Sequence, residues 1–272
     1  MNSSASFLDR SLYAVYRLAS SRITQQRKGR ALSLLSTYPI RAVLLDVDGT
    51  LYYQDRLRSL MALELCTLPV VQMSCRAAYE AWRALSTFRR VREELRSLGE
   101  AEVCLARWQY IAAAQRVGWH TTALENLVAE WLYQRPLKYL RLCRRRGLAA
   151  FLTFLERRGM QVGVFSDYPV MDKLRELGCA ERMSVALCAT DPEINAFKPS
   201  PKGFLRACTL WGLCPGEVLY IGDRSEVDAV GAANAGMPCA ILEHRAYRRV
   251  DNATRSTYDA FPSFTTLQHA LS

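Results

Sequence analysis

Short apolar runs recur along the chain and are separated by stretches in which apolar residues have helical spacing. Five runs have the length and the content of branched aliphatic residues typical of buried strands: the run from residue 40, then 160–165, 184–189, 217–221 and 238–242. Three stretches have the amphipathic pattern of helices: 170–177, 201–213 and 226–235. Strands that alternate with helices across short loops predict an α/β protein with a doubly wound, Rossmann-like parallel sheet.

The block over residues 57–146 has a different pattern. It contains few Gly or Pro residues, and its apolar positions, such as Ala78, Trp82 and Leu85, follow helical spacing. This predicts an all-helical insertion after the first strand, with Trp82, Trp108 and Trp131 in its core. The chain is then divided into three parts: a basic helical arm over 1–38, an α/β core formed by 39–56 and 147–272, and the helical insertion over 57–146.

The charge of the chain is uneven along its length. The net charge is +10, and residues 1–40 and 51–146 carry +5 and +7 of it. Such a field favours an anionic partner, which includes a phosphorylated small molecule, a nucleic acid or an acidic membrane surface. The basic arm is compatible with peripheral contact to a membrane or a protein. Nucleic acid is not expected as a partner, because no nucleic-acid-binding motif accompanies the charge.

Cysteine usage and hydropathy indicate where such a protein would reside. The nine cysteines are scattered without C-x-x-C spacing, which is typical of reduced thiols in a cytoplasmic protein. The longest apolar stretch, 60–71, is shorter than the roughly 20 residues that span a bilayer. The first twenty residues lack the pattern of a secretory signal peptide. We therefore expect a cytoplasmic location.

Polar groups follow the predicted strands and helices at the points where a ligand would bind. Asp46 and Asp48 come directly after the first apolar run, and in an open α/β sheet the ligand site lies beyond the carboxyl ends of the strands. Two such carboxylates can divide the work of nucleophile or metal ligand and of general acid and base. A hydroxyl, a lysine and a second acidic pair occur later, as Ser166, Lys198 and the segment 222–228. Together they indicate phosphoryl transfer assisted by Mg²⁺.

In their order and placement these groups resemble the motifs of the haloacid dehalogenase-like (HAD) superfamily of hydrolases. The four motifs are DVDGT at 46–50, Ser166, Lys198 and GDRSEVD at 222–228, and the resemblance extends over about residues 40–243. It implies a Rossmann-like core, a requirement for Mg²⁺ and an aspartyl-phosphate intermediate. The helical insertion lies where family members with a C1-type cap place that cap.

The resemblance also implies roles for single residues. Asp46 would be the nucleophile and Asp48 the general acid and base, as expected of phosphatases and phosphomutases and not of the dehalogenases. Asp46, the backbone carbonyl of Asp48, Asp223 and Asp228 would hold the metal, although Asp228 has the alternative of being only an early residue of the next helix. The phosphoryl group would be bound by Ser166 and Lys198.

The resemblance is less decisive for three further candidate substrate-binding residues. Asp167 is grouped with the phosphate-binding residues, yet many relatives carry Asn there and an added negative charge is unexpected. Tyr53 and Arg56 are placed at the entrance of the insertion, where they either contact the substrate or pack the hinge. The hypothesis is a Mg²⁺-dependent phosphatase that hydrolyses a small phosphomonoester. The alternatives are a phosphomutase of the same fold, and a protein that binds a membrane or a partner through the basic arm and the insertion.

Overall fold

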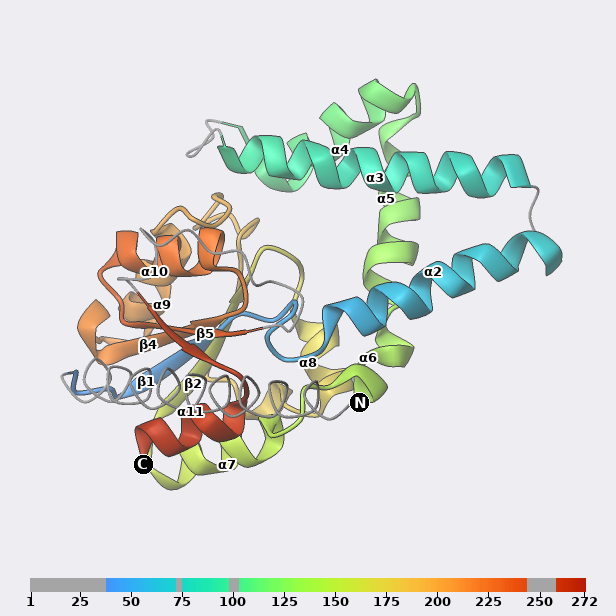
Figure 1. The fold of residues 1–272 in the computed structure, drawn as a ribbon. Helices are drawn as coiled ribbons and strands as arrows, with labels where there is room; N and C mark the ends of the chain where they lie inside the picture. The colour runs from blue at the N-terminus through green and yellow to red at the C-terminus, as the bar shows by residue number, and fades with distance from the viewer. Residues whose placement is uncertain (1–37, 72–74, 98–102, 244–257) are drawn as a thin grey trace, which may run out of the picture.

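A parallel sheet of six strands organises the computed structural model, which describes residues 38–71, 75–97, 103–243 and 258–272 (Figure 1). The strand order is β3-β2-β1-β4-β5-β6. The strands are β1 (Ala42–Leu45), β2 (Gln161–Ser166), β3 (Val185–Cys188), β4 (Val218–Gly222), β5 (Cys239–Leu242) and β6 (Asp259–Phe261). The five predicted strands and the α/β class are confirmed, whereas β6 was not predicted.

The central strands end within two residues of one another. Leu45 of β1 pairs with Val164 of β2 on one side and with Ile221 of β4 on the other. The segments that follow these strands therefore emerge side by side, at the point where the chain order reverses between β2 and β4. This is the position at which open α/β sheets bind ligands.

Alternate residues of the strands face two different layers of helices. Leu44 and Tyr220 belong to the apolar cluster that includes residues of α9 and α10, and Val43 and Leu45 to the one that includes residues of α7 and α11. Figure 1 shows these two pairs of helices on opposite faces of the sheet. The core helices are α7 (Leu148–Arg157), α8 (Met171–Leu177), α9 (Lys202–Trp211), α10 (Val230–Ala235) and α11 (Phe264–Leu271). Shorter helical turns are η2 (Ala180–Arg182), η3 (Pro215–Glu217) and η4 (Ser225–Ala229).

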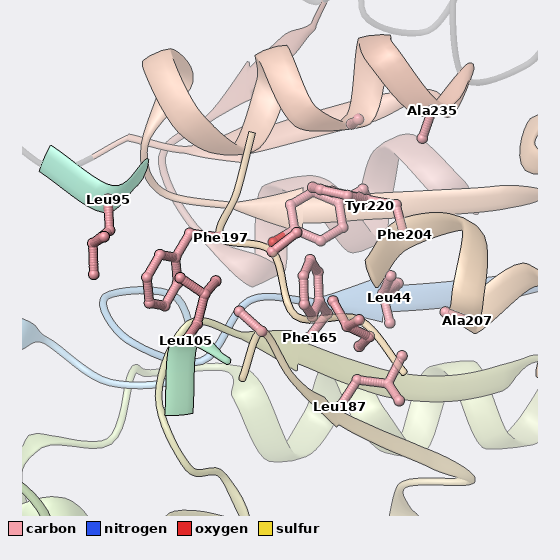
Figure 2. Packing of buried hydrophobic residues seen from close by; sticks show 14 of the residues in the cluster. Leu44, Leu95, Leu105, Phe165, Leu187, Phe197, Phe204, Ala207, Tyr220 and Ala235 are labelled. Atoms are coloured by element: carbon pink, nitrogen blue, oxygen red, sulfur yellow. The ribbon is translucent and has the colours of Figure 1, made fainter. Parts of the chain in front are cut away.

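Aromatic rings fill the space beneath the ends of β2 and β4 (Figure 2). The ring of Phe204 lies 5.2 Å from that of Phe165 and 4.7 Å from that of Tyr220, and all three residues are fully buried. Burying a side chain of this size contributes about 1.5–3 kcal/mol. Phe165 directly precedes Ser166, so this packing fixes the backbone from which candidate site residues emerge.

The segment between β1 and α7 is helical. It comprises α2 (Gln54–Val71), α3 (Cys75–Ser97), α4 (Leu105–Val117), α5 (Thr121–Val128), the π-helix η1 (Ala129–Gln134) and α6 (Leu137–Cys143). The two chain segments that join it to the sheet run side by side. Tyr52 pairs with Arg144 in an antiparallel bridge, and the Tyr53 N–H donates to the Cys143 carbonyl at 2.8 Å. We call this two-stranded connection the hinge.

The buried face of α3 differs from the predicted one. Trp82 is 54% exposed and stacks on Tyr79, and Trp108 of α4 is 40% exposed, so the prediction that both lie in the core is wrong. Trp131 is buried, as predicted. The residues that α3 buries are Ala81, Ala84, Leu85, Phe88, Val91, Arg92 and Leu95. Small alanine side chains permit a close approach between helices. A prediction from hydropathy alone instead chooses the face that carries tryptophan as the buried one.

Three further predictions concern the basic arm, membrane-spanning helices and the cysteines. The basic arm over 1–38 falls almost wholly on residues 1–37, outside the described residues. No helix in the described ranges has both the length and the apolar character needed to cross a bilayer. The nine cysteines form no disulfide.

Candidate active site

Asp46 and Gly49 bring the loop after β1 against the loop after β4. The backbone N–H of Asp46 donates to the carbonyl of Ile221 at 2.8 Å. Gly49 has a φ of +102°, and a Cβ atom there would lie 2.0 Å from Oδ2 of Asp223. Glycine is therefore required both by the backbone conformation and by the close approach of Asp223.

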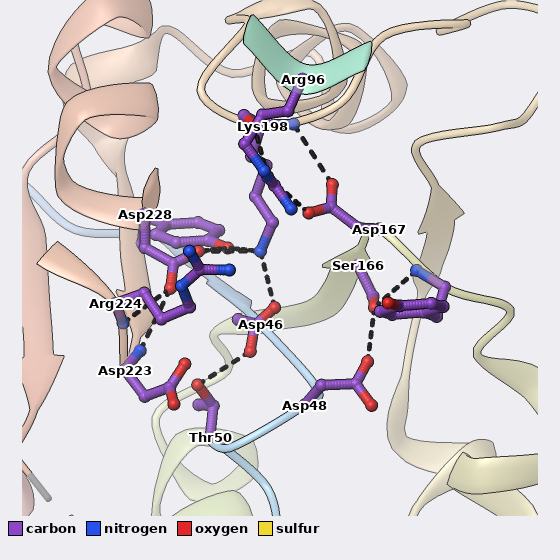
Figure 3. Close-up of polar contacts among 12 residues, drawn as sticks. Asp46, Asp48, Thr50, Arg96, Ser166, Asp167, Lys198, Asp223, Arg224 and Asp228 are labelled. Carbon is purple, nitrogen blue, oxygen red and sulfur yellow. Dashed lines mark hydrogen bonds and ion pairs between the residues drawn. The ribbon is translucent and has the colours of Figure 1, made fainter. Parts of the chain in front are cut away.

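Lys198 lies at the centre of the buried network (Figure 3). Its Nζ donates to Asp46 Oδ1 at 2.6 Å, to Asp228 Oδ1 at 2.7 Å and to the Tyr220 hydroxyl at 3.0 Å. These contacts occupy all three donors of the ammonium group. Burial alone would lower the pKa of Lys198, but the charges of Asp228 and Asp46 outweigh it and hold the pKa well above its usual value. Lys198 is thus a fixed cation shared by two carboxylates.

Asp46 has one oxygen on Lys198 and the other on a hydroxyl. Thr50 Oγ1 donates to Asp46 Oδ2 at 3.1 Å. Burial raises the pKa of Asp46 to about 7, and Lys198 lowers it less than burial raises it, while the charges of Asp228 and Asp48 add to the rise. Asp46 is therefore held in one orientation in a site crowded with negative charge.

Asp48, unlike Asp46, lies in an environment that stabilises its ionised form. Its carboxylate accepts hydrogen bonds from Ser166 Oγ at 2.9 Å, from Lys173 Nζ at 2.5 Å and from the Tyr52 hydroxyl. Burial would raise the pKa of Asp48, but the Lys173 ammonium group and these hydrogen bonds outweigh it and hold the pKa below its usual value. Two carboxylates that are two residues apart thus have different partners and opposite pKa shifts, which suits them to different steps of one reaction.

Three carboxylates form a group that could hold a metal ion. Ligand oxygens of Asp46, Asp223 and Asp228 all lie within 4.8 Å of one another. Oδ1 of Asp223 is buried without a hydrogen-bond partner. Burial and the charges of Asp46 and Asp228 raise the pKa of Asp223 well above its usual value. Two buried carboxylates and the partly buried Asp223, with one lysine shared by two of them, leave negative charge uncompensated, so the residues present fit a divalent cation that prefers oxygen ligands.

Asp228 is more than an early residue of the following helix. It is 1% exposed, and while Oδ1 accepts from Lys198, Oδ2 accepts the backbone N–H groups of Asp223 at 3.2 Å and Arg224 at 3.0 Å. These contacts set the direction of the loop that carries Asp223. The side chain of Asp48 lies outside the group of three carboxylates, and a metal contact from its backbone carbonyl stays a prediction.

The other predicted residues lie around this network. Asp167 pairs with Arg96 of α3 at 2.8 Å. Arg56 is exposed at the start of α2, and its guanidinium lies 4.5 Å from the centre of the Tyr53 ring. Arg145, on the other strand of the hinge, lies 5.1 Å from the same ring. Tyr53 and Arg56 are thus stacked on each other at the hinge, and a contact between either residue and a substrate stays a prediction.

Several residues in the network were not predicted from the sequence. Tyr220 lies inside an apolar strand, where a tyrosine fits the core as well as a site. Lys173 is one of several charged residues on a short amphipathic helix. Arg145 is 3% exposed and donates to the Gly49 carbonyl at 2.7 Å, although it belongs to a run of arginines that is typical of a solvated helix end. Of Tyr220, Lys173 and Arg145, only Tyr220 could have been found from the sequence. The alternation of side chains within β4 places it on the same face as Gly222, where the fourth motif begins.

Comparisons with known proteins agree with this arrangement. The model of the haloacid dehalogenase-like hydrolase family matches residues 40–236. The N-acetylmuramic acid 6-phosphate phosphatase of Pseudomonas aeruginosa is 31% identical over 109 residues, which cover 39% of this chain and 47% of that protein. The chain thus spans about half the length of the curated relatives it matches.

Solved structures share the fold across most of the chain. An HAD phosphatase from Thermococcus onnurineus has a TM-score of 0.59 at 23% identity and covers 86% of this chain and 98% of its own. The HAD-type protein YfnB from Bacillus subtilis, in a magnesium-bound crystal structure, has a TM-score of 0.60 at 15% identity over 86% of this chain and 99% of its own. With the family model matching more than half of the chain, the protein belongs to the haloacid dehalogenase-like hydrolase family.

Proposed function

We propose that this protein is a Mg²⁺-dependent phosphatase that hydrolyses a small phosphomonoester through a phosphorylated Asp46. The observation that carries the proposal is the contrast between Asp46, which is held by Lys198, and Asp48, which is held by Lys173 and Ser166 at the exit of the same strand. Curated relatives that match part of the chain are phosphatases of phosphorylated small molecules, which supports the same class of reaction.

The first half of the proposed reaction transfers the phosphoryl group to Asp46. A carboxylate oxygen of Asp46 attacks phosphorus, the bond from phosphorus to the ester oxygen breaks, and Asp48 gives the departing oxygen its proton. Lys198 and Ser166 offset the negative charge on the phosphoryl oxygens. This step needs the protonated form of Asp48, which the contact with Lys173 disfavours.

The second half returns the enzyme to its starting state. Asp48, now ionised, removes a proton from a water molecule whose oxygen attacks phosphorus. The bond between phosphorus and Asp46 breaks, and inorganic phosphate leaves. The contacts from Lys173, Tyr52 and Ser166 stabilise the ionised Asp48 that this step needs.

The metal site of the proposal consists of the carboxylates of Asp46, Asp223 and Asp228 with the backbone carbonyl of Asp48. A set made only of oxygen ligands suits Mg²⁺. When bound, the ion supplies positive charge that compensates the carboxylates and the phosphoryl oxygens. The unpartnered Oδ1 of Asp223 is the feature of the site that most needs such a cation.

A pocket beside the site indicates the size of the substrate. It has a volume of about 290 Å³, and Lys173 and Thr190 of the core line it together with Tyr133 and Leu137 of the insertion. Because Lys173 also reaches Asp48, the pocket adjoins the candidate acid and base. A pocket of this size accommodates a compact leaving group such as a phosphorylated sugar or organic acid. The matched relatives make N-acetylmuramic acid 6-phosphate and glyceraldehyde 3-phosphate the first esters to test.

Phosphate release from a panel of phosphomonoesters tests the proposal. The wild type is compared with Asp46→Asn in Mg²⁺ and in EDTA. Glu156→Gln is the control, because Glu156 is exposed on α7 and pairs with Arg182, and neither residue lines the pocket. We expect Mg²⁺-dependent turnover in the wild type and the control and none in Asp46→Asn. Turnover that persists in Asp46→Asn or in EDTA would refute the mechanism, and the absence of turnover on every ester would favour a phosphomutase or a binding protein.

A further inference from the structure

Asp167 places a negative charge directly after Ser166, and the structure shows how this charge is compensated. Its Oδ2 pairs with Arg96 Nη1 at 2.8 Å, and its Oδ1 accepts the backbone N–H of Lys198 at 3.2 Å. The residue is 8% exposed. Both oxygens therefore have partners, one on the insertion and one on the core.

Arg96 and Asp167 together hold the backbone of Lys198 (Figure 3). Besides its contact with Asp167, Arg96 Nη1 donates to the Lys198 carbonyl at 2.5 Å. The N–H of Lys198 is thus bound by Asp167 and its carbonyl by Arg96, while its Nζ reaches Asp46 at 2.6 Å. An arginine from helix α3 therefore contributes to the placement of the lysine that orients the candidate nucleophile.

The same end of α3 also contacts the loops after β2 and β4. Arg92 Nη2 donates to the Asp167 carbonyl at 2.6 Å, and Glu93 lies 3.7 Å from Arg224, which follows Asp223. Figure 2 shows Leu95 beside Phe197, in the apolar cluster that extends from the sheet into the insertion. The last turns of α3 are thus fastened to the core by both charged and apolar contacts.

We propose that Asp167 is a positioning residue that couples docking of helix α3 to the placement of Lys198 at Asp46. The inference rests on the proposed phosphatase reaction. With α3 docked, Arg96 compensates Asp167, and the pair is shielded from water. With α3 undocked, Lys198 loses one of its backbone contacts, and an uncompensated carboxylate remains beside Ser166, where it repels a phosphoryl group. Phosphate would then bind well only when α3 is docked.

A double-mutant cycle tests this coupling with two independent readouts. Asp167→Asn, Arg96→Gln and the double variant are compared for hydrogen exchange of the peptide over residues 84–97 and for KM and kcat with p-nitrophenyl phosphate. We expect each single variant to exchange faster in this peptide. Arg96→Gln should raise KM about tenfold because it leaves the Asp167 carboxylate uncompensated, and the double variant, which lacks that charge, should raise KM less than Arg96→Gln. Arg116→Gln is the control, because Arg116 of α4 pairs with Glu94 of α3 in a contact that lies within the insertion.

Several outcomes would overturn the coupling. One is unchanged exchange in both single variants, and another is a double variant in which the losses add. A lower kcat with unchanged KM and unchanged exchange would show a merely structural role, which also overturns it. If the wild type releases no phosphate from any ester, the proposed function fails, while the exchange measurement still decides whether Asp167 and Arg96 hold α3 in place.

Discussion

The α/β core and the helical insertion position their polar side chains by different means. In the core, Asp46, Ser166 and Asp223 emerge from the ends of neighbouring parallel strands, so the register of the sheet alone brings them together. In the insertion, Arg92 and Arg96 reach the site from one face of α3, and their contacts depend on how that helix packs. The comparison shows that topology determines the chemistry of the core, whereas side-chain packing determines what the insertion adds.

The largest expected effect concerns the cation of the core network. In Lys198→Met, Asp46 and Asp228 lose their shared partner, so phosphate release should fall by about a thousandfold or more. The free energy of unfolding in urea should fall by about 3 kcal/mol, since a buried charge network loses one member. Lys202→Met, at the exposed start of α9, is the control and should change both quantities little. Activity within tenfold of the wild type would contradict the central place of Lys198.

The next effect separates the true buried face of α3 from the one that the sequence predicts. Phe88 is fully buried and Trp82 is 54% exposed, although tryptophan is the larger residue. Phe88→Ala should lower the free energy of unfolding by about 3–4 kcal/mol, and Trp82→Ala by less than about 1 kcal/mol. Urea denaturation of both variants checks this order, and the reverse order would restore the predicted face.

A smaller effect is expected where the two core loops touch. Gly49→Ala adds backbone strain of about 1 kcal/mol and also displaces Asp223, for a total of about 2 kcal/mol. Gly159→Ala shares a positive φ, +66°, but no heavy atom lies within 4 Å of the added Cβ, so it isolates the strain. We expect only Gly49→Ala to need about tenfold more Mg²⁺ for half-maximal phosphate release. An equal Mg²⁺ requirement in the two variants would exclude Asp223 from the metal site.

The smallest expected effect concerns the core helix α8. Like the insertion, this helix contributes to the site through a side chain, that of Lys173. Lys173→Met removes the charged partner of Asp48, and kcat should fall about tenfold, which corresponds to about 1.4 kcal/mol. Lys138→Met is the control, because Lys138 pairs with Glu64 in the insertion. Steady-state kinetics on the preferred ester measure both variants, and equal values of kcat would remove Lys173 from the reaction.

The sequence predicted the parts of the protein that follow from local patterns. Short apolar runs located five strands, and the acidic and basic residues that follow them converge because parallel strands end at one edge of the sheet. Strand β6, with three residues, is too short to show such a pattern. Motif spacing was therefore enough to assemble Asp46, Lys198 and Asp228 into one candidate site, as the structure shows.

The remaining features depend on packing, which a single sequence does not reveal. The hydropathy of α3 predicted that Trp82 is buried, yet the buried face carries Ala81 and Ala84. Small residues permit a close approach of helices, which hydropathy does not reveal. Arg96 has the sequence context of a solvated helix, and only the tertiary arrangement brings it to Asp167. The unexpected charge of Asp167 was the one visible sign that a compensating cation had to come from elsewhere in the chain.

The central claim is that Asp46 becomes phosphorylated, and trapping the intermediate tests it most directly. The wild type would be mixed with its preferred ester and Mg²⁺, quenched in acid within one turnover and treated with borohydride, which reduces an aspartyl phosphate to homoserine. Mass spectrometry then locates the modified residue. The proposed mechanism predicts homoserine at position 46 and unmodified Asp48. Phosphate release without any conversion at position 46 would contradict it.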